Sequence, residues 1–140
     1  MKARILKKAQ RMLKQAGLRR TQQRVDVLGV LLNAKRPLTA EQIGRKLRSG
    51  TPDKVTIYRV LENFLHAGLV HRAYLADRSW HYELSDQCTE LQCHPHFTCT
   101  KCGSTRCMVD STIPMVKGLE QGFVVHRQQV RLEGLCPGCA

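Results

Sequence analysis

Two Cys-x-x-Cys pairs are the residues with the most recognisable chemistry in this chain. Cys99 with Cys102 and Cys136 with Cys139 form the two pairs. Four thiolates are the number of ligands that a tetrahedral structural zinc site needs, so the two pairs predict a structural zinc ion. A redox role is disfavoured, because thioredoxin-type pairs stand at the start of a helix in a strand-helix context that neither pair has here.

A second group of potential ligands surrounds the first pair. His94 and His96 are two residues apart, so on a strand both side chains point to one face and can bind one ion. Cys88 lies six residues before His94, and Cys93 lies directly before it. Cys107 follows Cys102 by five residues. Thiolate and imidazole ligands favour zinc over the oxygen-rich sets that suit manganese. The group predicts a second metal site, with Cys107 as a small core residue being the alternative.

The positive charge of the chain lies entirely in its first half. Residues 1–80 carry 18 Lys and Arg against 5 Asp and Glu, whereas residues 81–140 carry 5 against 6. The net charge of +12 therefore indicates that the first half of the chain binds a polyanion, and double-stranded DNA is the expected partner.

The composition also indicates where the protein acts. No apolar run is long enough for a signal sequence or a membrane span, so we expect a cytoplasmic protein that does not bind membranes. Reducing conditions there favour metal ligation over disulfides, and the seven cysteines are an odd number.

Helical periodicity and turn signals dominate the first 84 residues. Helices are predicted over 2–16, from Thr21 to before Pro37, over 39–49 with a Thr39/Gln42 capping box, and from Lys54 to Gly68. A two-stranded hairpin follows from Leu69 to Leu84, interrupted at 76–79. This order predicts a winged helix-turn-helix domain.

The remainder predicts a second, smaller domain. Short strands are expected at 97–100 and 105–109, then a helix over about 111–121 and a strand over 123–133. The fold class is therefore α+β, with a winged-helix DNA-binding domain at 1–84, a hinge at 85–93 and a metal-binding domain at 94–140.

The second helix of a helix-turn-helix motif lies in the major groove, which selects the candidate DNA contacts. On the helix that begins at Lys54, the exposed polar residues Lys54, Thr56, Tyr58 and Arg59 are the candidates. Arginine can bind guanine with two hydrogen bonds, and lysine more often contacts phosphate. Arg19 and Arg20, between two helices, are predicted to contact phosphate or the minor groove.

Several runs of sequence resemble the ferric uptake regulator (Fur) family of metal-dependent repressors. The matching runs are AGLRRTQQR at 16–24, LTAEQI at 38–43, VTIYRVLENFLHAGLV at 55–70, HPHFTCTKCG at 94–103 and GFVVHRQQVRLEGLCPGC at 122–139. The resemblance implies a homodimer formed through the C-terminal domains, whose winged-helix domains bind a palindromic operator when metal is bound.

The resemblance also implies roles for individual residues. Arg19, Tyr58 and Arg59 match residues that touch DNA, and His94 and His96 match two ligands of the sensory metal site. The four paired cysteines match the structural zinc set.

Some positions depart from the iron- and peroxide-sensing members. Arg36 stands where those members have a metal-binding histidine before Pro37, and Cys107 stands where they have an acidic ligand. Gln128 replaces a histidine of an accessory site, while His126 lies two residues earlier. Thiol ligation and the missing histidine make the chain most similar to the zinc uptake regulator branch.

The fourth ligand of the sensory site is predicted to be Cys88, six residues before His94, a spacing similar to the cysteine ligand of zinc-sensing members. The alternatives are Cys93, Glu83, His81 and Asp77, of which Glu83 matches the family's strand acid.

These observations predict a zinc-responsive repressor. The alternatives are an iron-sensing member of the family and, from a different class, a zinc-ribbon DNA-binding protein that senses nothing. An enzyme is disfavoured: His81-Tyr82-Glu83 has the His-x-Glu form of zinc deaminases, but Pro137 lies inside the second cysteine pair instead of ahead of it. We therefore expect neither catalysis nor a small-molecule substrate.

Overall fold

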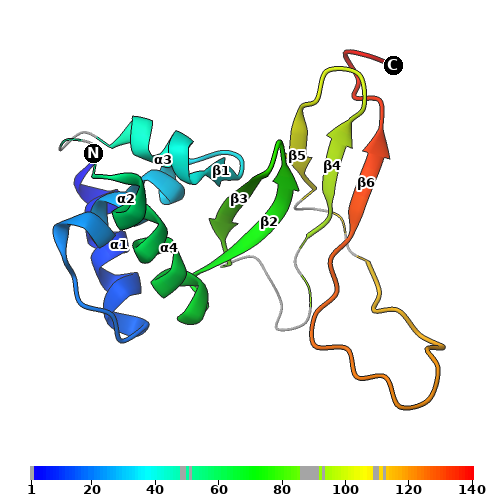
Figure 1. The fold of residues 1–140 in the computed structure, drawn as a ribbon, viewed down its shortest axis with the longest axis horizontal. Coiled ribbons are helices and arrows are strands. Elements are labelled where there is room, and N and C mark those ends of the chain that lie inside the picture. Colours follow the sequence, from blue (N-terminus) through cyan, green and yellow to red (C-terminus); the bar gives the residue numbers. More distant parts are fainter. Residues whose placement is uncertain are drawn as a thin grey trace. The chain divides into compact units, whose positions relative to one another are not determined.

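The chain folds into two compact units, Met1–Ser85 and Asp86–Ala140. The computed structural model (Figure 1) describes residues 2–47, 50, 52–85, 92, 94–108, 111 and 113–140. Most of the predicted hinge at 85–93 lies outside these residues, so its role as a hinge stays a prediction. Among the described residues, no helix is both long and apolar enough to cross a membrane.

Unit 1 contains the four predicted helices. They are α1 (Ala3–Gln15), α2 (Gln22–Asn33), α3 (Ala40–Lys46) and α4 (Lys54–His66). Both α1 and α4 end at a glycine with positive φ, Gly17 at 72° and Gly68 at 72°. In each case the N–H of the next residue, Leu18 or Leu69, donates a hydrogen bond of 2.9 Å to the carbonyl oxygen of the residue five positions earlier. This arrangement satisfies the last carbonyls of the helix and ends it.

The predicted capping box begins α3. The Gln42 N–H donates to Thr39 Oγ1 at 3.1 Å, and the Thr39 N–H donates to Gln42 Oε1 at 2.9 Å. Two N–H groups that the helix itself cannot satisfy are thereby paired.

Replacing Thr39 with alanine is expected to lower the free energy of unfolding of unit 1 by about 1 kcal/mol, because the Gln42 N–H loses its side-chain acceptor. Urea unfolding followed by circular dichroism measures the change. Thr39→Ser keeps the hydroxyl and is the control; equal losses in the two variants would contradict the capping role.

A three-stranded antiparallel sheet completes the winged helix. Its strands are β1 (Leu38–Thr39), β2 (Val70–Ala76) and β3 (Ser79–Leu84), in the order β1-β3-β2. Asp77 and Arg78 connect β2 to β3 with φ of 49° and 62°, the left-handed backbone that a two-residue hairpin turn requires. The predicted hairpin is confirmed, whereas the two-residue strand β1 was not predicted.

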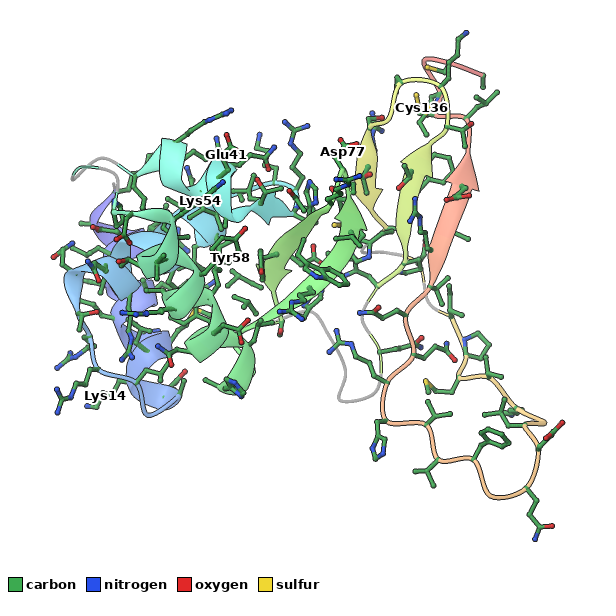
Figure 2. The ribbon with its side chains drawn as sticks, viewed as in Figure 1. Lys14, Glu41, Lys54, Tyr58, Asp77 and Cys136 are labelled. Atoms are coloured by element: carbon green, nitrogen blue, oxygen red, sulfur yellow. The ribbon has the colours of Figure 1, made fainter. Side chains whose placement is uncertain are left out.

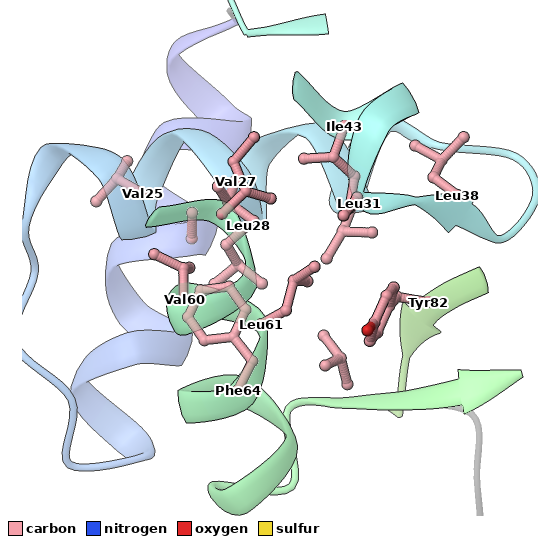
Figure 3. Close-up of a cluster of buried hydrophobic side chains, with 14 of the residues drawn as sticks. Val25, Val27, Leu28, Leu31, Leu38, Ile43, Val60, Leu61, Phe64 and Tyr82 are labelled. Carbon is pink, nitrogen blue, oxygen red and sulfur yellow. The ribbon is translucent and has the colours of Figure 1, made fainter. Parts of the chain in front are cut away.

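The core of unit 1 is formed by the inward faces of the helices and the sheet (Figure 3). Leu28 of α2, Ile43 of α3, and Leu61 and Phe64 of α4 are completely buried. Tyr82 of β3 adds a buried aromatic ring to the same cluster. These contacts fix one face of α4 in the core, so its opposite face is presented to solvent.

Unit 2 is built on a small mixed sheet. The strands are β4 (His96–Cys99), β5 (Thr105–Cys107) and β6 (Arg131–Gly134), in the order β5-β4-β6. β5 pairs antiparallel with β4, and β6 pairs parallel with it. Together with the helices of unit 1, this sheet confirms the α+β fold class.

The helix predicted over about 111–121 is wrong, since residues 113–121 contain none. Gly118 has a φ of 78°, which a helix does not accept, and Pro114 lacks an N–H. The Gln128 side chain also binds backbone groups of the segment: its Oε1 accepts from the Val116 N–H at 2.8 Å and its Nε2 donates to the Pro114 carbonyl at 3.2 Å. Of the strand predicted over 123–133, only residues 131–133 are confirmed as strand, and the observed strand continues to Gly134.

Candidate metal centre and nucleic-acid interface

The two Cys-x-x-Cys pairs meet at one point of unit 2. The sulfur atoms of Cys99, Cys102, Cys136 and Cys139 all lie within 4.8 Å of one another. Cys102 Sγ and Cys136 Sγ are 3.8 Å apart, although they are 34 residues apart in the sequence. The arrangement has the ligand number and type of a tetrahedral thiolate metal site.

Strand pairing is what brings the two pairs together. β4 ends at Cys99, which lies opposite Gly134 of β6 in the parallel ladder. The Thr100 N–H donates to the Gly134 carbonyl at 2.8 Å. The two Cys-x-x-Cys pairs therefore begin close to each other, at the same end of the β4–β6 ladder. The turn of the first pair is closed by the Cys99 N–H, which donates to the Ser104 carbonyl at 2.9 Å.

Backbone dipoles prepare the cluster for negative charge. The N–H groups of Cys102 and Cys136 each donate to Cys99 Sγ at 3.5 Å and lower the pKa of Cys99 to about 6. The Ser104 hydroxyl, 3.1 Å from Cys102 Sγ, lowers the pKa of Cys102.

Cys139 has the opposite shift. Its pKa is raised to about 12 by the neighbouring sulfurs, above all that of Cys136. Four negative sulfurs cannot be held this close without a compensating cation, so the last proton stays until one is bound. A divalent ion supplies that compensation, and binding it releases protons.

A second ligand group lies at the other end of the β4–β5 pair. His96 of β4 is directly opposite Cys107 of β5 in the ladder. One ligand atom from each of His94, His96 and Cys107 lies within 4.8 Å of the others. The two imidazole rings meet edge to face with centroids 5.0 Å apart, and His96 is buried. The structure thus brings three of the predicted sensory ligands together in unit 2.

The candidates for a fourth ligand are in different situations. Cys88 and Cys93 lie outside the described residues. Asp77 is exposed in the β2–β3 turn. The His81 ring stacks on Tyr74 with centroids 4.3 Å apart, and burial lowers the pKa of His81.

Glu83 has a partner within unit 1 that the sequence did not suggest. Its Oε1 lies 2.7 Å from Nε2 of His71, whose Nδ1 is 3.3 Å from Ser85 Oγ. The side chain of His71 is 5% exposed and that of Glu83 is 12% exposed. His71 lies opposite Glu83 in the hairpin only because of a register shift between Arg72 and Tyr74, and the sequence carries no signal for that shift.

The exposed face of α4 carries the predicted DNA contacts. Lys54, Tyr58 and Arg59 are exposed, and Figure 2 shows Lys54 and Tyr58 on the ribbon of this helix. The Thr56 N–H donates to the carboxylate of Asp53 at 2.7 Å, and hydrogen bonds from Thr56 lower the pKa of Asp53. Thr56 therefore contributes to the start of α4 as well as to its surface.

Arg72 connects the wing to α4. Its guanidinium donates to Glu62 Oε1 of α4 at 3.1 Å and lies 5.3 Å from the centroid of the Trp80 ring. These contacts orient the hairpin against the helix that carries the candidate DNA contacts. Arg19 and Arg20 are both exposed between α1 and α2.

Comparison with known proteins identifies the family. The model of the ferric uptake regulator family matches residues 15–132. The peroxide operon regulator of Bacillus subtilis (strain 168) is 31% identical, with 100% of this chain and 97% of that protein covered. The ferric uptake regulation protein of Legionella pneumophila is 33% identical, with 91% and 95% covered.

A solved structure supports the same fold. The zinc uptake regulator in complex with zinc and DNA superimposes with a TM-score of 0.64 at 24% identity, covering 96% of this chain and 92% of that one. The exposed α4 face, the paired metal-ligand groups and the family match agree with one another. The chain belongs to the ferric uptake regulator family, whose members are metal-responsive, DNA-binding transcription regulators and not enzymes.

Proposed function

We propose that this protein is a repressor that senses zinc and binds a palindromic operator as a metal-loaded homodimer. The observation that carries the proposal is the presence of two separate ligand groups in unit 2. One contains four cysteines, and the other contains His94, His96 and Cys107. We propose that the first group is a permanently occupied structural site and the second an exchangeable sensory site.

The first group is proposed to hold structural zinc. An all-sulfur, closed set of four ligands suits zinc, and it leaves no open position for substrate. Zinc bound there would offset part of the negative charge of the four thiolates and would hold the ends of β4 and β6 together.

The second group is proposed to hold the sensed zinc. Cys107 supplies a thiolate beside two imidazoles, a set that favours zinc over harder ions. We propose Cys88 or Glu83 as the fourth ligand; the pairing of Glu83 with His71 supports Glu83 as a pre-oriented carboxylate. Cys88→Ser and Glu83→Gln separate the two choices by their effect on zinc affinity.

The homodimer is proposed to form through unit 2. Large apolar side chains of this unit are exposed, including Phe123 at 70% and Val124 at 77%. Val116, Leu119 and Leu132 are exposed as well. A domain that exposes several large apolar side chains is a candidate for coverage by another chain, and a second copy is the partner that a palindromic operator requires.

The mechanism follows from linkage between metal and DNA. In the proposed mechanism, the sensed zinc closes the set formed by His94, His96, Cys107 and a fourth ligand. The DNA-binding geometry of the dimer is then favoured when the set is closed, so operator affinity rises with occupancy. Selection from a random duplex library in the presence of zinc tests this function, and it should enrich a palindrome.

Replacing Arg59 with alanine is expected to weaken binding to the selected operator by about 30-fold or more, because the dimer loses two base-reading arginines and each loss costs roughly 1–3 kcal/mol. Fluorescence anisotropy with a labelled operator measures the change. His66→Ala, at the exposed last turn of the same helix, is the control and should bind like the wild type. Equal effects of the two substitutions would contradict the assignment of the α4 surface.

A further inference from the structure

The exposed face of α1 is a continuous row of cations. Arg4, Lys7, Lys8, Arg11 and Lys14, which we call the α1 stripe, are all exposed. At 3.6 residues per turn they fall within an arc of about 120°. Ala9 and Leu13 lie on the opposite side and are completely buried in the core of unit 1. The stripe therefore points away from the rest of the unit.

The stripe is unfavourable for the helix by itself. Its members stand three or four residues apart, where like charges repel. Cations in the first turn also oppose the helix dipole, and α1 has no acidic residue there. Nine Lys and Arg precede the first acidic residue of the chain, Asp26. Within the described part of the chain, no stripe residue forms an ion pair or hydrogen bond through its side chain.

Duplex DNA is the partner that this charge pattern fits. The stripe ends at Lys14 (Figure 2), and the exposed Arg19 and Arg20 follow after the turn at Gly17. α1 belongs to the same compact unit as α4. Between Arg4 and Lys14 the helix rises about 15 Å, the length of roughly four base pairs.

We propose that the α1 stripe binds the phosphate backbone of the duplex that flanks each operator half-site. This inference rests on the proposed function, because α4 must first place unit 1 on DNA. Lysine and arginine contacts to phosphate add affinity without sequence information. The stripe thus lengthens the footprint and makes operator binding more dependent on salt.

The test is the triple variant Lys7→Gln, Lys8→Gln, Arg11→Gln, measured by anisotropy at several salt concentrations. Each lost phosphate contact is expected to reduce the slope of log affinity against log salt by about 0.9, so three substitutions per chain, which remove six contacts per dimer, should reduce it by about 5.4. The control is Lys101→Gln, Lys117→Gln, Arg127→Gln, which removes the same charge from unit 2 and should keep the wild-type slope. Equal slopes for the wild type and the α1 variant would overturn the proposal.

The length of the operator duplex provides a second test of the α1 stripe. Trimming about five base pairs from each flank of the operator should weaken wild-type binding and leave the α1 variant nearly unaffected. Wild-type binding that does not depend on flank length would overturn the inference while leaving the proposed function intact. Failure of the wild type to bind any duplex would instead contradict the proposed function.

Two further readouts exclude other roles for the stripe. Glutamine keeps helix propensity, so the thermal midpoint of the variant should be no lower than that of the wild type. A lower midpoint with an unchanged salt slope would show that the stripe is structural. Vesicles of phosphatidylserine and phosphatidylcholine should not compete with the flanked operator; loss of vesicle binding in the variant with unchanged DNA binding would assign the stripe to membranes.

Discussion

Replacing Cys136 with serine is expected to remove one metal ion per chain and to unfold unit 2. Metal binding and folding are one equilibrium in sites of this kind, and the ion contributes on the order of 10 kcal/mol. β6 contains four residues and its partner β4 contains four, so the sheet has little else to hold it. Metal analysis, size-exclusion chromatography with light scattering and circular dichroism are the measurements. We expect a monomer that keeps the helices of unit 1.

Cys107→Ser is the matched control for that experiment, since it makes the same chemical change outside the four-cysteine cluster. It should keep one tightly held zinc per chain and remain dimeric. A Cys136→Ser protein that retains its metal and its dimer would show that the cluster is not a structural site.

Replacing His96 with alanine is expected to abolish the response of operator binding to zinc. His96 is buried, lies opposite Cys107 in the β4–β5 ladder and contacts the His94 ring, so its loss removes a central member of the ligand group. Coupling between an effector and DNA typically amounts to about 5-fold to 150-fold in affinity, and the variant should stay at the weak end of that range at every zinc concentration. Anisotropy with the selected operator measures the response, and metal analysis should still find the structural ion.

His126→Ala is the control for this substitution, because His126 is an exposed histidine outside both ligand groups. It should respond to zinc like the wild type. A His96→Ala protein with a normal zinc response would place the sensory site elsewhere.

Local sequence signals predicted most of unit 1. Thr21, Thr39 and Asp53 each accept a hydrogen bond at the start of a helix, and Gly17 and Gly68 end two of them. These signals act over three to five residues, so they can be recognised without knowledge of the tertiary structure. The two-residue strand β1 could not be recognised from the sequence, because it exists only through its pairing with β3.

The helix prediction for residues 111–121 was wrong, and part of the cause lies within the segment itself. Pro114 and Gly118 both disfavour a helix, because Pro114 lacks an N–H and Gly118 has a positive φ. The contacts that decide its conformation come from Gln128, which lies well beyond the segment in sequence and also donates to Gln92 Oε1 at 2.8 Å. A side-chain amide acting at that separation has no signature in the sequence.

The four-cysteine group was easier to predict from the sequence than the group of His94, His96 and Cys107. Cys-x-x-Cys spacing alone identified the four sulfurs, because each pair is a local turn that needs only one further contact between β4 and β6. The meeting of His96 with Cys107 depends on the β4–β5 register, which the spacing of five residues after Cys102 only suggested. The His71–Glu83 pair was missed because an irregularity between Arg72 and Tyr74 shifts the register of the hairpin.

The most direct test of zinc sensing is a titration with zinc of protein that holds only its structural ion after mild chelation. Operator affinity and bound metal are measured at each step. We expect operator affinity to rise as the second zinc per chain binds and to level off at two zinc ions per chain. Operator affinity that is the same at one and two zinc ions per chain, or a protein that binds only one, would contradict it. A second equivalent of iron that displaces zinc in anaerobically purified protein would assign the sensory site to iron.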